Sequence, residues 1–417
     1  MMSAYLDRFV VQPKEFQIDQ PRTHAVGLTR GKNFVYVSAD MVHRYISGQT
    51  NAGKTTLAQT LMEVDFLRGR KIVEIEPALE AKNERAFMNL PNDDDGMLEV
   101  LNKYFHLEPR PFKAIVYSPA TRKYRAFMKN DEGIRSKFYK SLKITEPDVV
   151  DLILAIFPGG SIERLIINKA YKKYTEEIRP KRKERSISEF LEVFEEVGKE
   201  ANFSSFTLLK LEYIASVLHS DGKHKIDEIL KKKDEISVFT FTFIRDPLER
   251  YLWAMAILNI IYDRWEYLKR KEDILSFYVA DAHLLAPKKK KDMIDTLARY
   301  QERMKQNLQV YSRISRGKGL LWTFDSQEFD DLDDVVVAQC QERFIKRMRN
   351  RDVAEKLKID YTELRRLDKK FAFFDDGYMV KKILVRPPMS RKARSGEFLP
   401  IHFVKEYKRW ENEEANY

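Results

Sequence analysis

Residues 48–55 have the types and spacing of a loop that binds phosphate. They read Gly-Gln-Thr-Asn-Ala-Gly-Lys-Thr and match the pattern G-x-x-x-x-G-K-T. In such a loop the glycines let backbone N–H groups turn toward the phosphates at a helix N-terminus, the lysine reaches the terminal phosphates, and the threonine hydroxyl can bind Mg²⁺. The pattern predicts a nucleoside triphosphate site, and we expect its ligands to be ATP and Mg²⁺.

The residues around the loop indicate the strand and the helix that must position it. An apolar run at 42–47 precedes the loop, and residues 56–62 follow with helical spacing and no proline or glycine. The residues expected to contact the nucleotide are Gly48, Gln49, Thr50, Asn51, Ala52, Gly53, Lys54, Thr55 and Thr56. Of these, we expect Lys54 to act in catalysis and Thr55 to bind the metal ion.

An ATPase of this kind also needs an acidic group that holds Mg²⁺ and the attacking water beside the γ-phosphate. Asp281 ends an apolar run that begins at Leu275, and the carboxyl ends of parallel strands form the ligand crevice of such a sheet. We therefore predict Asp281 as a metal ligand and catalytic residue, with a simple turn cap as the alternative. Glu76 ends the run 71–76 in the same way, and it either orients Mg²⁺ or water or pairs with a lysine.

Charge points to the class of partner. The net charge of +11 indicates affinity for polyanions, of which nucleic acid is the leading candidate. The lysine run at 288–291 and the basic cluster at 181–183 either contact DNA phosphates or are solvated loops.

Length and cysteine content exclude other classes. The 417 residues, 43% of them hydrophobic, are enough for two to three domain-sized units with large cores. A single cysteine, Cys340, excludes a disulfide within the chain and a multi-cysteine zinc site. No apolar stretch approaches the length of a membrane span, and residues 1–8 lack an apolar signal core. We therefore expect a cytoplasmic protein without a membrane segment.

Strand and helix patterns alternate along the chain. The expected strands are 34–37, 42–47, 71–76, 114–117, 238–244, 275–281 and 320–324. A long apolar helix is expected at 248–268, and residues 146–233 read as helical segments broken by proline and glycine. Strands separated by helices predict an α/β fold with a mostly parallel central sheet, helices on both faces and a helical insertion.

These patterns divide the chain into four parts. The expected parts are an N-terminal strand segment at 1–40, an ATPase core at 41–145 and 234–390, a helical insertion at 146–233 and a basic C-terminal tail at 391–417. Near the end of the core, Asp376-Gly377 between two apolar runs predicts a hairpin turn. The tail that follows is expected to be extended.

The order of these motifs resembles that of the HerA/FtsK superfamily, a group of ring-forming ATPases that pump DNA, here of the archaeal, viral or plasmid HerA-like kind. The resemblance covers about residues 30–390. The matching segments are 43–50 at the P-loop, 75–80 at an acidic strand end, 279–287 at the Walker B strand, 325–333 at the sensor and 337–344 in a helix after it. Their order and spacing carry the resemblance.

The resemblance implies a RecA/FtsK-like P-loop NTPase fold and ATP hydrolysis coupled to translocation of duplex DNA. It further implies a homohexameric ring with nucleotide between subunits, and a nuclease or other DNA-processing protein as a partner. A DNA packaging or transfer ATPase of a virus or plasmid uses the same core and remains an alternative. A nucleotide-binding regulatory or scaffold protein with weak hydrolysis is the alternative from another class.

Two departures from the family pattern affect the predicted site. The family usually carries Asp-Glu at the Walker B position, where this chain has Ala280-Asp281, so Asp281 takes the place of the catalytic glutamate. The strand before the sensor is longer than expected, so either Gln327 or Asp325 occupies the sensor position. We favour Gln327 because of its amide.

The family also completes its site with an arginine from the next subunit, which neutralises charge on the γ-phosphate. Arg316, beside Arg313 before the sensor strand, is our first choice. Arg343 and Arg347, on the helix expected after that strand, are its rivals.

Overall fold

The structure of the chain is a computed structural model. It describes residues 21–77, 84–129, 132–145, 148–151, 154, 161–178, 180, 187–202, 205–288, 295–394, 396–397 and 399–414. Several sequence predictions fall outside these residues: the first 20 residues of the N-terminal segment, the acidic strand end beyond Pro77, the lysines at 289–291 and the basic cluster at 181–183.

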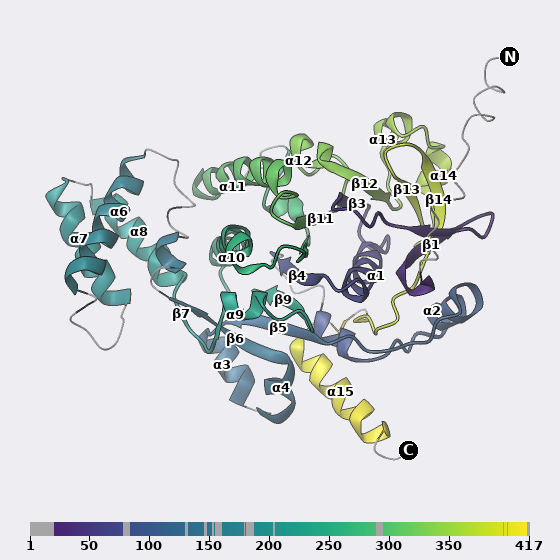
Figure 1. Cartoon of the computed structure of the whole chain (residues 1–417), viewed down its shortest axis with the longest axis horizontal. Helices are drawn as coiled ribbons and strands as arrows, with labels where there is room; N and C mark the ends of the chain where they lie inside the picture. Colours follow the sequence, from purple (N-terminus) through teal and green to yellow (C-terminus); the bar gives the residue numbers. More distant parts are fainter. Residues whose placement is uncertain are drawn as a thin grey trace.

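Within the described residues, fourteen strands form one sheet (Figure 1). The strands are β1 (Ala25–Thr29), β2 (Phe34–Tyr36), β3 (His43–Ser47), β4 (Lys71–Glu76), β5 (Ala114–Pro119), β6 (Tyr139–Ile144), β7 (Ser220–Asp221), β8 (His224–Lys225), β9 (Ile236–Thr240), β10 (Leu275–Val279), β11 (Leu320–Ser326), β12 (Cys340–Ile345), β13 (Phe371–Asp375) and β14 (Val380–Val385). Their order is β2-β1-β14-β13-β12-β3-β11-β10-β4-β9-β5-β6-β7, with β8 beside β6.

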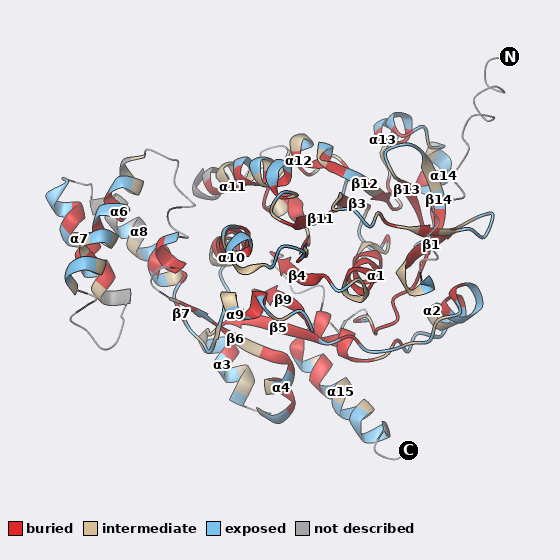
Figure 2. Ribbon diagram, in the orientation of Figure 1, coloured by how far each residue is buried: buried red, intermediate tan, exposed pale blue. Residues whose placement is uncertain are grey.

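The strands from β12 to β6 in this order run parallel to one another. At one edge, β13, β14, β1 and β2 extend the sheet in antiparallel pairs. Figure 2 shows that the central strands are buried along their length, as expected for parallel strands covered on both faces. The prediction of an α/β fold with a mostly parallel sheet is confirmed.

Helices lie on both faces of the sheet. The helices of the described residues are α1 (Lys54–Leu67), α2 (Asp95–Val100), α3 (Arg122–Lys129), α4 (Glu132–Phe138), α6 (Ile162–Lys173), α7 (Ile187–Glu200), α8 (Ser205–Val217), α9 (Ile226–Leu230), α10 (Pro247–Leu268), α11 (Asp295–Ile314), α12 (Asp334–Ala338), α13 (Arg351–Lys356), α14 (Tyr361–Arg365) and α15 (Pro400–Glu414). One core joins α10 and α11 to one face of the sheet, and a second core joins α1 to the other face. Among the described helices, none is long and apolar enough to cross a bilayer.

Two of the expected elements differ in the structure. β9 ends at Thr240 instead of continuing to residue 244, because the chain turns with the N–H of Ile244 donating to the carbonyl oxygen of Phe241 at 2.9 Å. Residues 340–345, expected to lie in a helix, form β12, while the helix before them ends at Ala338. Parallel pairing with β3 satisfies the backbone of this segment and buries its apolar side chains, which explains the strand.

The region expected to be a helical insertion contains α6, α7 and α8, which form a lobe at one end of the molecule in Figure 1. The chain then returns to the sheet through the short strands β7 and β8, both paired with β6. The boundaries at 146 and 233 remain predictions.

The end of the chain differs from the expected extended tail. The hairpin at Asp376-Gly377 is present, with β13 and β14 paired so that Asp375 lies opposite Val380. After it, residues 391–394 have no regular structure, but Pro400–Glu414 form α15. Aromatic contacts explain this helix, because Phe403 packs edge-on against Phe87 with ring centroids 5.6 Å apart.

The segment between the hairpin and α15 lies on α1 of its own chain. Buried Glu63 of α1 accepts hydrogen bonds from the backbone N–H groups of Met389 and Ser390, both at 2.9 Å. Glu63 also forms an ion pair with buried Arg386 at 3.2 Å. These contacts fasten the segment to the helix that follows the P-loop.

Candidate functional site

The P-loop joins the carboxyl end of β3 to the start of α1, as its sequence predicts. Gly53 caps the helix with a φ of 90°, and a Cβ added there would lie 2.9 Å from the carbonyl oxygen of Lys369. Gly48 begins the turn with a φ of 154°, where a Cβ would lie 2.5 Å from the Cβ of Lys346. Both positions therefore require glycine. The tip of the loop, Thr50 and Asn51, is exposed.

The rest of the loop is held by backbone hydrogen bonds. The N–H of Gln49 donates to the carbonyl oxygen of Arg347 at 3.0 Å, and the N–H of buried Ala52 donates to that of Gln49 at 3.1 Å. Lys54 Nζ donates to the carbonyl oxygen of Gly48 at 2.6 Å. The lysine thus folds over the loop, at the N-terminus of α1, where a helix attracts negative charge.

The two carboxylates that the sequence places after β10 and in β11 lie together. Asp281 has a φ of 44°, a left-handed conformation that aspartate tolerates better than most residues. Its backbone N–H donates to Oδ1 of Asp325 at 2.9 Å. Burial, and then the charge of Asp281, raise the pKa of Asp325 to about 7, while the nearby Lys54 acts in the opposite direction. Lys54, Asp281 and Asp325 therefore form one electrostatic group.

The structure places the two sensor candidates differently. Asp325 is 8% exposed and contacts Asp281. Gln327 follows the end of β11 and is half-buried, and among the described residues no hydrogen bond of its side-chain amide is found. Although the sequence favours Gln327, Asp325 is the candidate that lies beside Asp281 and Lys54. The role of Gln327 remains a prediction.

Glu76 lies at the carboxyl end of β4 and is 7% exposed. Its Oε1 atom is buried and has no hydrogen-bond partner among the described residues. Burial, and then the charge of Glu74, raise the pKa of Glu76 well above its usual value. The alternative of a pair with lysine is not supported within the described part of the chain, where no ion pair of Glu76 is found.

Arg85 is a residue of this region that the sequence did not indicate. Its guanidinium is buried and forms an ion pair with Glu74 at 2.8 Å, while Nη1 donates to the carbonyl oxygen of Thr55 at 3.3 Å. It therefore connects the middle of β4 with the first turn of α1. The only sequence signal was a glutamate at position 74 inside an apolar strand, which needs a partner when buried.

Arg316 lies near the amino ends of the parallel strands, whereas the P-loop lies at their carboxyl ends. Its charge lowers the pKa of His43 and of Cys340, which begin the parallel strands β3 and β12, whereas the P-loop follows the end of β3. Arg316 is therefore not part of the nucleotide site of its own chain. Arg313, in the last turn of α11, is exposed.

The rival arginines lie in other places. Arg343 is in β12, where Nε donates to the carbonyl oxygen of Cys340 at 3.1 Å and Nη1 lies 3.7 Å from Asp375. Arg347 contacts the P-loop through its backbone carbonyl oxygen. Of the lysine run, the described Lys288 forms an ion pair with Asp334 at 3.0 Å, so this side chain is occupied within its own chain.

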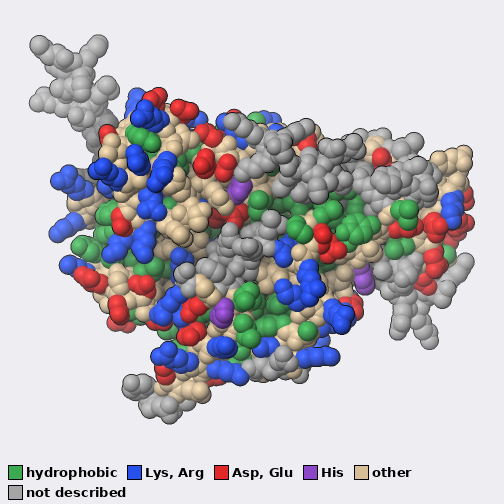
Figure 3. Space-filling view, turned by 180° about the vertical axis from the view of Figure 1, so that it is seen from behind, with side chains coloured by type: hydrophobic (Ala, Val, Ile, Leu, Met, Phe, Trp, Pro, Cys, Tyr) green, Lys and Arg blue, Asp and Glu red, His purple; other side chains and the backbone are tan. Residues whose placement is uncertain are grey.

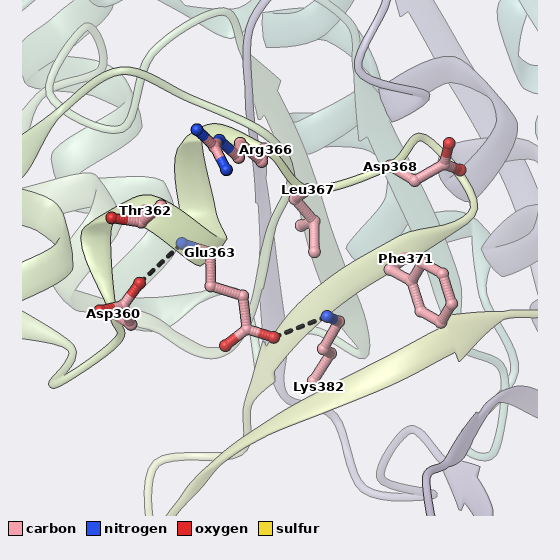
Figure 4. Close-up of a pocket in the computed structure, with 8 residues that line it drawn as sticks. All are labelled: Asp360, Thr362, Glu363, Arg366, Leu367, Asp368, Phe371 and Lys382. Atoms are coloured by element: carbon pink, nitrogen blue, oxygen red, sulfur yellow. Dashed lines mark hydrogen bonds and ion pairs between the residues drawn. The ribbon is translucent and has the colours of Figure 1, made fainter.

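A hollow of about 460 Å³ lies near the P-loop, lined by Asp360, Thr362, Glu363, Arg366, Leu367, Asp368, Phe371 and Lys382 (Figure 4). Glu363 and Lys382 form an ion pair at 2.6 Å in its lining. Lys369, between the lining residues Asp368 and Phe371, has its carbonyl oxygen close to Gly53 of the P-loop. Mixed charge of this kind does not by itself identify a ligand.

The residues of the site fit a nucleotide with a divalent cation. Carboxylates and hydroxyls are the oxygen ligands that Mg²⁺ prefers, and one or two carboxylates with phosphate and water are its usual set. No cluster of three or more His, Cys, Asp or Glu able to hold a metal is found in the described part of the chain. A cation here would instead be held by Asp281 and Thr55 together with the phosphates and water.

Comparison with protein-family models finds no match, and neither does comparison with curated protein sequences. Several solved structures have a similar fold. VirB4 of Thermoanaerobacter pseudethanolicus is 12% identical with a TM-score of 0.52, over 87% of this chain and 95% of that one. The bacterial conjugative coupling protein TrwB, in its trigonal form with sulphate, is 13% identical with a TM-score of 0.53, over 88% and 95%. TrwB in complex with ADP and Mg²⁺ is 13% identical with a TM-score of 0.52, over 88% of this chain and 96% of that one.

At these identities the comparisons establish the fold. The likeness extends over most of both chains. The chain therefore shares the fold of VirB4 and TrwB, an α/β fold with a mostly parallel sheet, as the sequence predicts.

Proposed function

We propose that the chain is an ATPase that uses ATP and Mg²⁺ to move double-stranded DNA. One observation carries the proposal: the P-loop lysine, Lys54, lies near Asp325, which accepts the backbone N–H of Asp281 at 2.9 Å, after the ends of adjacent parallel strands. This arrangement can hold a triphosphate, a divalent cation and a water molecule in the order that phosphoryl transfer needs.

The roles of the side chains follow from their chemistry. Lys54 neutralises the terminal phosphates, and the Thr55 hydroxyl contributes to cation binding. Asp281 orients the attacking water and accepts its proton. Gln327 senses the γ-phosphate, and Glu76 supports the cation or its water from β4. Bound Mg²⁺ supplies charge to stabilise the transferring phosphoryl group.

Arg316 completes the site from a neighbouring subunit. This proposal is supported by the place of Arg316 near the amino ends of β3 and β12, away from the P-loop of its own chain. It implies a closed ring of identical subunits, in which the surface that carries the P-loop of one subunit contacts the surface that carries Arg316 of the next. We propose a hexamer.

Charge and fold support DNA as the substrate. The chain carries a net charge of +11. Figure 3 draws the face of the molecule opposite to that of Figure 1. Lysine and arginine side chains gather on the left half of this view, the side of the molecule where β13 and β14 lie. The similar fold of TrwB, a conjugative plasmid coupling protein, favours transfer of plasmid DNA within the class of DNA motors.

ATP hydrolysis and displacement of a third strand from duplex DNA would test this function. We expect duplex DNA to stimulate hydrolysis, and ATP to drive removal of a triplex-forming strand. The Lys54→Ala variant should do neither. The proposal would be contradicted if Lys54→Ala hydrolysed ATP as fast as the wild-type protein, or if duplex DNA had no effect on either reaction.

A nucleotide-binding regulatory or scaffold protein is the second candidate. The observation that favours it is Ala280, which occupies the place where the resembling family has a carboxylate. This candidate predicts tight ATP binding and turnover too slow to detect, with or without DNA. The hydrolysis assay therefore separates the two functions.

A further inference from the structure

Ala280 lies between two acidic residues on neighbouring strands. In the parallel pair β10–β4, Val279 lies opposite Ile75, and in the pair β10–β11 it lies opposite Phe324. One residue further along, Ala280 is level with Glu76 on one side and Asp325 on the other. The N–H of Ala280 donates to the carbonyl oxygen of Ile75 at 3.0 Å, which continues the register beyond the end of β10.

The alternation of side chains decides which way these residues point. Val279, Ile75 and Phe324 belong to the core on the α10 side of the sheet. Because successive side chains in a strand point to opposite faces, Glu76 and Asp325 point to the face that α1 covers. Tyr278 shows the same alternation, since its hydroxyl donates to Oδ2 of Asp65 in α1 at 2.7 Å.

Glu74 and Arg85 lie near both acids, but the other neighbours of the two acids differ. Asp325 accepts the N–H of Asp281; burial and the charge of Asp281 raise the pKa of Asp325 to about 7, and the charge of the nearby Lys54 acts against this rise. Glu76 lies among Glu74, Arg85 and Glu84, on the side of Ala280 away from β11. Of these two acids, Asp325 is therefore the one that lies both beside Ala280 on the neighbouring strand and near the P-loop lysine.

We propose that Asp325 supplies, from β11, the carboxylate that is missing at Ala280, so that the acidic pair of the nucleotide site is divided between two adjacent strands. Asp325 supports the cation, and Asp281 orients the water. The inference rests on the proposed ATPase function and deepens it. It also explains how a chain without the usual Asp-Glu pair keeps two acids beside Lys54.

The Asp325→Asn variant tests this role. Asparagine keeps the Oδ1 acceptor for the N–H of Asp281 but removes the negative charge. We expect Mg²⁺ to strengthen binding of a non-hydrolysable ATP analogue to the wild-type protein, and this strengthening to fall at least about tenfold in Asp325→Asn, as loss of a cation-supporting group does. Binding of the analogue in EDTA should be unchanged. Calorimetry measures both affinities on the full chain.

Two further variants make the result specific. Asp330→Asn removes a carboxylate outside the site, which contacts Asn350 at 3.2 Å, and should leave the effect of Mg²⁺ intact. Adding Ala280→Asp to Asp325→Asn should restore the effect, because it returns the charge to the same level of the sheet. An unchanged Mg²⁺ effect in Asp325→Asn, or its loss in Glu76→Gln alone, would overturn the proposal.

The single variant Ala280→Asp gives a test that does not depend on the folding of Asp325→Asn. If Asp325 already fills the role, the added carboxylate should change the Mg²⁺ effect less than about twofold; a tenfold gain would show that the role is vacant. Failure of this inference is distinct from failure of the function. A wild-type protein that binds no ATP analogue contradicts the function, whereas one that hydrolyses ATP with Asp325→Asn unaffected contradicts only the inference.

Discussion

Lys54 Nζ lies 2.6 Å from the carbonyl oxygen of Gly48, so the P-loop holds its own lysine by a backbone acceptor. A second carbonyl oxygen, that of Gln49, lies at 3.4 Å. Both acceptors are neutral, whereas phosphate oxygens are charged and form stronger hydrogen bonds with an ammonium. A triphosphate can therefore take the lysine from the loop without breaking an ion pair.

Replacement of this lysine should weaken nucleotide binding. A hydrogen bond to a charged group contributes roughly 1.5–3 kcal/mol, so Lys54→Ala should lower the affinity for an ATP analogue by roughly 10- to 100-fold. Calorimetry would measure the change. The matched control is Lys113→Ala, which removes an exposed lysine paired with Asp234. Equal affinities for both variants would argue against the site.

The Asp281→Asn variant should bind ATP but not hydrolyse it. A neutral amide keeps the shape of the side chain and cannot accept a proton, and loss of a general base often lowers the rate by about 10²–10⁴. The backbone hydrogen bond to Asp325 is kept, so the local structure should remain. Single-turnover hydrolysis measures the effect. A rate within about threefold of wild type would show that another group acts as the base.

The place of Arg316 predicts complementation between subunits. Arg316→Ala should be inactive alone because its ring lacks the arginine, and Lys54→Ala should be inactive because it lacks the P-loop lysine. Rings mixed from the two variants contain interfaces with both groups intact and should regain part of the hydrolysis rate. If mixing restores no activity although mixed rings form, Arg316 does not act in trans.

Mixed rings of Arg313→Ala with Lys54→Ala provide the control for position. Arg313 is exposed and close in sequence, so its variant should be active without a partner. An inactive Arg313→Ala that is complemented by Lys54→Ala would transfer the role to Arg313.

The P-loop could be predicted because its information is local. Eight consecutive residues fix the turn, and the strand and helix that hold it are their neighbours in the chain. The alignment of Glu76, Ala280 and Asp325 side by side on neighbouring strands could not be predicted. It depends on the order β4-β10-β11, which joins three segments distant in sequence. Sequence periodicity gives strands but not which strands are neighbours.

Two further differences have physical causes. β12 was expected as a helix from the family resemblance, although β3 needs a parallel partner on that side to satisfy its backbone. Arg85 was missed because its importance comes from the buried Glu74, and the pair forms only when β4 and α1 pack together. In both cases tertiary contacts outweigh local sequence.

Buried His43 predicts a pH-dependent stability. Its Nδ1 accepts the N–H of Trp322 at 3.2 Å, so protonation at this atom would break the bond. Burial, and then the charge of Arg316, lower the pKa of His43 from 6.5 to about 4. A lowered pKa means that the stabilisation is complete above pH 6.5 and is lost as the pH falls through 4, by about 3 kcal/mol in total.

Comparison with His43→Gln isolates this contribution, since glutamine does not titrate. The raised pKa of Glu84, about 7, acts with the opposite sign and is present in both proteins. The difference in melting temperature between wild type and variant should be largest near pH 7 and shrink toward pH 4. A difference that stays constant over this range would contradict the role of His43.

Binding to DNA should depend strongly on salt and weakly on sequence. A motor must accept every sequence that passes through it, so its contacts are to phosphates, and the affinity of such contacts falls as salt rises because counterions are no longer released favourably. With about 6–10 phosphate contacts, the affinity for duplex DNA should fall by roughly 10³-fold or more between about 50 and 200 mM salt. Competition between duplexes of different sequence, at both salt concentrations, measures the two properties together. A strong preference for one short sequence, with little effect of salt, would contradict the motor and favour a sequence-reading regulator.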